Sequence, residues 1–321
     1  MEEASITLPT KPGASLRISF YTPPSPSQPN PSSISPTTTP PLLLVFLNGL
    51  ILPRSSWTGT INSLLNQHSR HFNHPKSQNN IHILTYDRYG QGDSDPDPTD
   101  PPAAQTPYGH DSRAIVYDLH ELLTQFCHSK LNTSGTEVRL LFIANSIGCP
   151  LARLYSQTYH PPSTPSESLP VVVVGYIFLD SMMANSDFVS PPLFPDPDSR
   201  DFDESKLPDG ITTNDIRHAR DMFGRYFHPD VPNPERFDRR NLRELLPFAD
   251  RPALPRVKIV VASGEEVDPK MVVVGHDWDV FAENCESVSL PRHSSLPHWQ
   301  GIDPSEATIA ENCLGVDIIK C

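Results

Sequence analysis

The chain has 321 residues, of which 37% are hydrophobic and 20% charged, and its formal net charge is −13. This length suits one large α/β domain or two small ones, and the composition is that of a globular protein with a hydrophobic core. The acidic balance argues against a nucleic-acid backbone or an anionic membrane surface as the partner. A small neutral substrate remains compatible with it.

No run of about 18 apolar residues occurs, so we expect no membrane span. The acidic start, Met1 to Ser5, lacks the apolar region of a secretory signal. The cysteines are scattered without metal-site or disulfide-framework spacing, which favours reduced thiols and a cytoplasmic location. They are Cys127, Cys149, Cys285, Cys313 and Cys321. No phosphate-binding glycine loop or metal-ligand cluster occurs in the sequence, so we expect neither a cofactor nor a metal.

Short apolar strands alternate with helices along residues 1–181, interrupted by a Pro/Ser/Thr-rich loop at residues 22–41. The predicted strands are 15–21, 42–47, 81–86, 138–144 and 171–179. The predicted helices are 57–65, 111–126 and 147–159. This alternation predicts an α/β fold with a mainly parallel central sheet flanked by helices.

The pattern changes at residues 182–254, where prolines, aspartates and two short helical segments, 213–227 and 239–246, replace the strands. We interpret this region as a helical cap inserted into the core. Residues 255–321 then complete the core. The segments expected there are strands 257–262, 271–274 and 287–290 and a final helix at 305–313.

A serine lies where the predicted strand 138–144 gives way to a helix, in the sequence Asn145-Ser146-Ile147-Gly148. A sharp strand-to-helix turn exposes a nucleophile above the sheet, and small residues such as Ala144 and Gly148 allow the close chain approach that it needs. The helix N-terminus, with the Ile147 N–H as one donor, would stabilise an oxyanion. The alternative is that Ser146 only caps the helix.

Three motifs together resemble the α/β-hydrolase family. They are the Ser146 motif, the strand-end sequence Leu47-Asn48-Gly49-Leu50, and the Gly-rich turn from Tyr86 to Ser94. The resemblance implies that Leu50 N–H is the second oxyanion donor and that Asp87 and Arg88 fix the turn. Asn48 stands where the family usually has His, and Ala144 where it usually has Gly.

The family order of nucleophile, acid and histidine directs the search for the other two catalytic residues. Asp268 follows the predicted strand 257–262 in a Gly-containing turn and is our predicted acid. Asp277, after strand 271–274, and Asp180, after strand 171–179, are the alternatives.

For the base, His293 follows the last predicted strand, 287–290, and the 25 residues separating it from Asp268 leave room for a helix. His276 and His298 are the alternatives. The segment from Ser287 onward resembles the family least.

A serine nucleophile forms an acyl-enzyme, which suits carboxylic esters and thioesters. Aromatic residues and a methionine of the predicted cap would line an apolar acyl pocket, or would simply pack the cap onto the sheet. They are Phe188, Phe194, Met222, Phe223, Tyr226 and Phe227. We therefore predict a serine esterase or thioesterase acting on a small molecule, and the resemblance implies lipid or polyketide-type metabolism. A non-catalytic ligand-binding relative and an acyltransferase using the same serine are the alternatives.

Overall fold

The computed structural model describes residues 1–23, 40–71, 81–131, 138–159, 171–180, 184–191, 194–207, 210–248, 259–260, 266–267 and 269–275. A seven-stranded sheet in the order β1-β2-β4-β3-β5-β6-β9 forms its centre. The strands are β1 (Glu2–Thr7), β2 (Ser15–Tyr21), β3 (Leu42–Leu47), β4 (Ile81–Tyr86), β5 (Val138–Asn145), β6 (Val171–Leu179) and β9 (Lys270–Val274).

The neighbours from β4 through β3, β5 and β6 to β9 pair in parallel, whereas β2 is antiparallel to β1 and to β4. Parallel neighbours require crossover connections, and helices supply three of them. These are α1 (Thr58–His71), α2 (Ser112–Lys130) and α3 (Gly148–Tyr159). The mainly parallel sheet with flanking helices confirms the predicted fold class.

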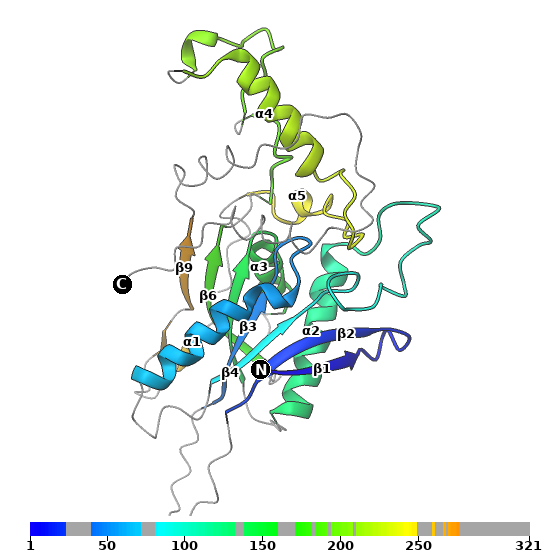
Figure 1. Cartoon of the computed structure of the whole chain (residues 1–321), viewed down its shortest axis with the longest axis vertical. Helices are drawn as coiled ribbons and strands as arrows, with labels where there is room; N and C mark the ends of the chain where they lie inside the picture. The colour runs from blue at the N-terminus through cyan, green and yellow to red at the C-terminus, as the bar shows by residue number, and fades with distance from the viewer. Residues whose placement is uncertain are drawn as a thin grey trace, which may run out of the picture.

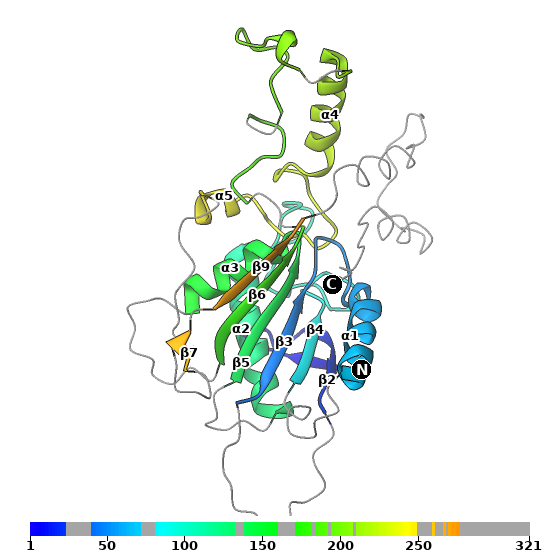
Figure 2. The same cartoon turned by 90° about the vertical axis from the view of Figure 1, so that its left-hand side faces the viewer.

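Helices cover both faces of the sheet, with α1 on one side and α2 and α3 on the other (Figure 2). The side chains of β3 show why. Leu43, Val45 and Leu47 belong to the larger buried cluster with α2 and α3, whereas Leu44 and Phe46 join the smaller cluster with the α1 side. Alternate residues of a strand point to opposite faces, so an entirely apolar strand needs cover on both.

Helix α2 begins where the Asp111 carboxylate accepts hydrogen bonds from the N–H groups of Arg113 and Ala114. These bonds satisfy backbone donors that have no partner inside the helix. The apolar face predicted from the sequence is buried throughout. It consists of Ile115, Leu119, Leu122, Leu123 and Phe126.

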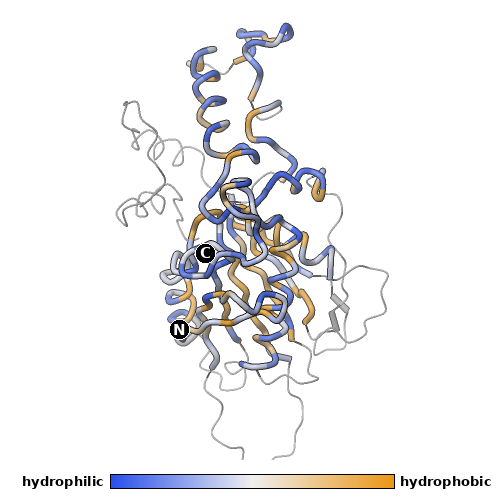
Figure 3. Tube along the Cα trace, turned by 90° about the vertical axis from the view of Figure 1, so that its right-hand side faces the viewer, coloured by the Kyte–Doolittle hydropathy of each residue, from blue (hydrophilic) through white to orange (hydrophobic). Residues whose placement is uncertain are grey.

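The described residues between 184 and 248 form a largely hydrophilic extension beyond the carboxyl ends of the parallel strands (Figures 1 and 3). We call its described part, residues 184–191, 194–207 and 210–248, the insertion. It contains the 3₁₀ turn η3 (Glu204–Lys206), α4 (Thr213–Tyr226) and the single turn α5 (Leu242–Leu245). No residue of α4 is buried, whereas Phe237, Leu242 and Leu246 join the main core cluster. The insertion is thus anchored through its last part.

Several sequence expectations need correction. β1 was not predicted, because only Ile6 of its six residues is buried. The helix expected at 239–246 is only α5. The 3₁₀ turn η1 (Arg54–Trp57) precedes α1. Within the strand expected at 257–262, the described residues form β7 (Ile259–Val260), which pairs with β8 (Glu266–Val267) outside the main sheet. The strand expected at 287–290 and the helix expected at 305–313 lie outside the described residues.

Candidate active site

Ser146 lies at the sharp turn between β5 and α3 with a left-handed backbone, at φ 50°. Its N–H donates to Leu179 O of the neighbouring strand at 3.1 Å, and its carbonyl accepts from the Cys149 N–H at 3.1 Å. A left-handed backbone in a non-glycine residue costs about 1–3 kcal/mol and recurs at functional sites. The side chain is half-buried. An ordinary helix N-cap has an extended backbone, so Ser146 is not simply a cap of α3.

Two glycines bring the end of β3 against this turn. A Cβ added to Gly148 would lie 2.6 Å from Leu47 O, and one added to Gly49 would lie 2.8 Å from the Asn145 Oδ1 and 3.6 Å from the Ser146 Cβ. The Gly148 contact is with a backbone carbonyl that cannot move aside, so glycine is required there, whereas the close contact of Gly49 is with a side-chain oxygen. The loop that follows β3 therefore passes directly beside Ser146.

The loop Asn48 to Ile51, which we call the oxyanion loop, is held by buried polar groups of the Gly-rich turn. Arg88 donates through Nη1 to Asn48 O at 2.9 Å and through Nη2 to Gly49 O at 2.8 Å. Gln91 Nε2 donates to the same Gly49 carbonyl at 3.1 Å. Leu50, the predicted oxyanion donor, follows these two fixed peptides, and Ile147, the other donor, begins the turn into α3.

The Asn48 side chain links the loop to both neighbouring elements. Its amide donates to Tyr86 O at 2.8 Å and to Gln91 Oε1 at 3.0 Å, and its Oδ1 accepts from Trp57 Nε1 at 2.8 Å. Because the polar atoms of the Asn48 side chain all have hydrogen-bond partners, its burial costs little free energy. Asn48 thus has a structural role at this position.

Asp87 and Arg88, which we expected to fix the Gly-rich turn, bind different parts of the structure. The Asp87 carboxylate accepts from the Arg54 N–H and Nη1, each at 2.5 Å, and from the Asp93 N–H at 3.2 Å. This anchors the turn to η1, as expected. Arg88 instead forms a buried ion pair with Glu235 of the insertion at 2.9 Å. Its role extends beyond the turn to the oxyanion loop.

Of the candidate acids, Asp180 is the one that lies within the described residues. It directly follows β6, has φ 46°, and donates its N–H to Val274 O at 2.8 Å. Strand β9 ends at the same edge of the sheet, because Val274 pairs with Leu179. Asp268, Asp277, His276, His293 and His298 lie outside the described residues.

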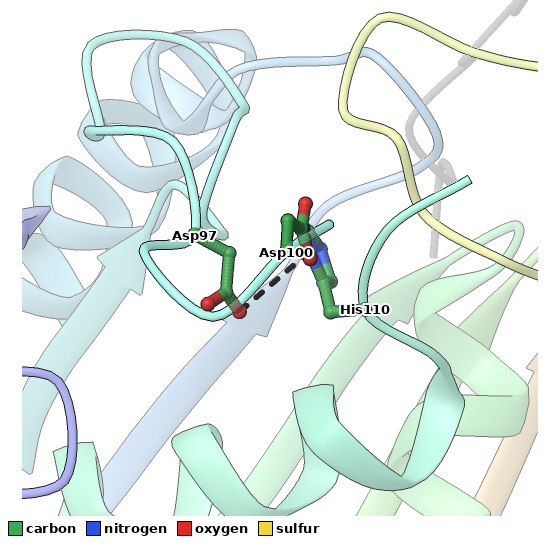
Figure 4. A group of neighbouring side chains, drawn as sticks. All are labelled: Asp97, Asp100 and His110. Carbon is green, nitrogen blue, oxygen red and sulfur yellow. Dashed lines mark hydrogen bonds and ion pairs between the residues drawn. The ribbon is translucent and has the colours of Figure 1, made fainter. Parts of the chain in front are cut away.

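A second polar cluster joins the loop before α2 to the N-terminal hairpin (Figure 4). Asp97, Asp100 and His110 each offer a possible metal-ligand atom within 4.8 Å of the others. However, the Lys11 ammonium lies 2.5 Å from an Asp97 oxygen and 2.7 Å from an Asp118 oxygen. Asp97 is thus already paired with a buried cation, and an Asp100 oxygen lies 3.2 Å from His110 Nδ1, so we interpret the cluster as a structural polar network.

Burial raises the pKa of Asp118 in this network to about 6, although the Lys11 ammonium acts in the opposite direction. For Asp97, burial also acts upward, but hydrogen bonds from Lys11 and Thr99 outweigh it and lower the pKa. The two carboxylates differ because burial of Asp118 outweighs its ion pair with Lys11, whereas Asp97 accepts additional hydrogen bonds from Thr99.

A cavity of about 600 Å³ lies elsewhere, on the outer side of α2 and α3. Its lining includes Lys11, Tyr117, Asp118 and Tyr159 but none of the predicted site residues. It is therefore separate from the Ser146 turn.

A mainly parallel sheet, a strained serine between strand and helix, and a glycine loop beside it define a protein of the hydrolase-fold class. The chain belongs to the alpha/beta hydrolase family, whose model matches residues 44–311. No curated protein shows significant similarity to the chain. Among the described residues, no helix is both long and apolar enough to cross a membrane.

Solved structures similar to this chain include two esterases and a thioesterase domain. The esterase EaEST from Exiguobacterium antarcticum is 15% identical with a TM-score of 0.34, over 56% of this chain and 46% of that one. A thermostable carboxyl esterase from Bacillus coagulans is 14% identical with a TM-score of 0.34, over 59% and 45%. The thioesterase domain of the curacin biosynthetic pathway is 14% identical with a TM-score of 0.34, over 56% and 44%. The chain spans less than half the length of these three structures, and the similarity carries no information about its substrate.

Proposed function

We propose that this protein is a serine hydrolase that cleaves a carboxylic ester or thioester through an acyl-enzyme on Ser146. The observation that carries the proposal is the left-handed backbone of Ser146 at the β5–α3 turn, with the Gly49 backbone packed against it. Strain of this kind persists only where the surrounding structure holds it in place, and it is concentrated at active sites.

In the proposed reaction, Ser146 Oγ attacks the carbonyl carbon while a histidine takes the hydroxyl proton. The N–H groups of Leu50 and Ile147 stabilise the oxyanion of the tetrahedral intermediate. As the intermediate collapses, the histidine returns the proton to the leaving alcohol or thiol. Water then attacks the acyl-enzyme by the same sequence of steps, releasing the acid and restoring Ser146.

The acid and the base belong to the proposal. The parallel pairing of β9 with β6 supports Asp277 over Asp268, because Asp277 follows the strand end at the Ser146 edge whereas Asp268 precedes the strand. Asp180 follows the end of β6 at the same edge. His293 stays the predicted base, with His276 and His298 as alternatives.

An apolar acyl group is favoured by the aromatic side chains of the insertion, which we propose to be a cap. Phe194 and Phe223 contact each other edge to face at 5.0 Å between ring centroids, and Phe223 lies 5.1 Å from Phe227. Phe227 is 48% exposed. Exposed aromatic side chains are suited to binding an apolar group.

A fluorophosphonate probe tests the nucleophile. We expect the wild-type chain to be labelled and the Ser146→Ala variant to be unlabelled but folded. Ser156→Ala is the matched control, because Ser156 is a buried serine on the helix that follows the turn and accepts a hydrogen bond from Tyr176. A folded wild-type chain that resists labelling would support a non-catalytic binding protein instead.

Substitutions of the candidate acids and bases test the rest of the triad. We expect Asp277→Asn to reduce turnover of a p-nitrophenyl ester at least as strongly as the same change at Asp268 or Asp180. We expect His293→Ala to reduce it at least as strongly as the same change at His276 or His298. Loss with Asp268→Asn or Asp180→Asn alone would transfer the acid role to that residue. Product analysis with an added alcohol distinguishes hydrolysis from acyl transfer.

A further inference from the structure

Glu235 is a buried carboxylate of the insertion, only 2% exposed, and it was not found from the sequence. Its position is fixed by its neighbours. Arg236, at φ 59°, donates through Nη2 to the carbonyls of Pro101, Thr106 and Tyr108 at 2.6, 3.0 and 3.2 Å. The Gly109 N–H donates to Arg236 O at 2.7 Å. The residue that follows Glu235 is therefore tied to the loop before α2 through both its side chain and its backbone.

The carboxylate of Glu235 accepts hydrogen bonds from three parts of the site. Oε1 accepts from the Ile51 N–H, from Gln91 Nε2 at 2.9 Å and from Arg88 Nη2 at 3.1 Å, and Oε2 accepts from Arg88 Nε at 2.9 Å. Arg88 and Gln91 are the groups that hold the Gly49 carbonyl. Glu235 thus contacts the oxyanion loop directly after Leu50 and, through two side chains, directly before it.

The contact between Glu235 and Ile51 holds a strained backbone in place. The φ of Ile51 is 59°, a left-handed conformation that a β-branched side chain strongly disfavours. A charge-assisted hydrogen bond from its N–H to Glu235 holds the residue in that conformation. Without the bond, Ile51 would relax toward a negative φ and rotate the Leu50–Ile51 peptide.

We propose that Glu235 is a positioning residue that holds the oxyanion loop so that the Leu50 N–H faces the carbonyl attacked by Ser146. The inference rests on the proposed function for its catalytic consequence, whereas the fixing of the loop is measurable by itself. Glu235 does not touch the substrate. It acts through Ile51, Arg88 and Gln91.

The size of the effect follows from what an oxyanion donor contributes. Removing one such donor lowers kcat by about 100- to 1,000-fold, and misplacing a catalytic group by about 1 Å costs about 100-fold. We expect Glu235→Ala to lower kcat about 100-fold with KM changed by less than about 3-fold, because the donor acts mainly in the transition state. Glu235→Gln keeps one oxygen acceptor for Ile51 and should lose about 10-fold.

Asp97→Asn is the matched control. Asp97 also forms a buried ion pair, with side-chain exposures of 8% for Lys11 and 0% for Asp97, against 3% and 1% for Arg88 and Glu235. Its carboxylate accepts hydrogen bonds from Lys11 and Thr99, which lie outside the oxyanion loop. A general loss of stability would therefore affect both variants alike.

The experiment combines hydrogen–deuterium exchange of the peptide containing Asn48 to Ile51 with steady-state kinetics on a p-nitrophenyl ester. We expect faster exchange and a lower kcat in Glu235→Ala, with Asp97→Asn close to wild type in both after matching for melting temperature. Glu235→Gln provides the same comparison if the alanine variant does not fold. Unchanged exchange in the Glu235 variants, or faster exchange with unchanged kcat, overturns the inference. A wild-type chain without Ser146 reactivity overturns the proposed function, while the exchange result still decides whether Glu235 holds the loop.

Discussion

The strain at Ser146 makes a specific prediction about stability, because two substitutions that both remove the hydroxyl should differ. Ser146→Ala keeps a Cβ in the left-handed region, at φ 50°, where an L-residue loses about 1–2 kcal/mol. Ser146→Gly removes that steric cost but adds about 0.5–1 kcal/mol of backbone entropy in the unfolded chain. We expect the glycine variant to be more stable than the alanine variant by roughly 0.5–1 kcal/mol.

The assay is urea denaturation of the three proteins, with melting temperature as a second measure. A difference of this size corresponds to a shift of only about 1–3 °C in a chain this long. Thr124 of α2 provides the control, because it is exposed in a regular helix. There the order should reverse, with Thr124→Ala more stable than Thr124→Gly by about 1 kcal/mol.

The result that would refute the reasoning is a Ser146→Gly variant no more stable than Ser146→Ala. It would mean that the turn relaxes to an ordinary backbone when the serine is removed. The surrounding structure would then not be holding the turn in its left-handed conformation.

Three further predictions concern the packing around the turn and its buried charges. Gly148→Ala places a Cβ 2.6 Å from the Leu47 carbonyl, so we expect a loss of about 1–3 kcal/mol in unfolding free energy and a loss of turnover. Burial raises the pKa of Asp118 to about 6, so the folded protein holds this proton more tightly than the unfolded chain does. The contribution of Asp118 to stability therefore falls as the pH rises from about 4 to about 6. Asp118→Asn should therefore gain up to about 3 kcal/mol relative to wild type between pH 4 and pH 7, measured by denaturation at each pH. Arg88→Lys keeps the charge but cannot bond Glu235 and two loop carbonyls together, so it should lose about 2–4 kcal/mol of stability and reduce kcat as Glu235→Ala does.

Each of these has a contradicting outcome. A Gly148→Ala protein with wild-type stability would show that the strand and the turn are not in backbone contact. An Asp118→Asn protein whose stability relative to wild type is constant with pH would place the carboxyl pKa near its ordinary value. An Arg88→Lys protein that turns over ester normally would separate the buried ion pair from the oxyanion loop.

The strands and the serine turn could be predicted because they depend on local patterns. Five strand patterns were sharply bounded in the sequence, so four of the predicted strands match the observed bounds and the fifth, β5, differs by one residue. The parallel direction of β3, β4, β5 and β6 then followed from the helices that connect them in the sequence. Ser146 could be found because strand, small residues and helix are adjacent in the sequence around it.

The residues missed by the sequence analysis act over long sequence separations. Glu235 lies 184 residues from Ile51 along the chain, and nothing in Asn233-Pro234-Glu235-Arg236 distinguishes it from a solvated surface acid. β1 was missed for a related reason. It pairs with β2 at the sheet edge and buries one side chain, so its sequence lacks the alternation that identifies a strand.

Ser146 and Ile51, two of the strained residues of the site, are held from different parts of the fold. Ser146 is held by β6, through Leu179 O, whereas Ile51 is held by the insertion, through Glu235. Phe237, in the last part of the insertion, is buried in the main core cluster, whereas no residue of α4 is buried. Local stability should therefore be high where the insertion supports the oxyanion loop and low at α4. In the proposed reaction we therefore expect that α4 can move without displacing the Leu50 N–H, so that substrate entry and preorganisation of the oxyanion loop do not have to compete.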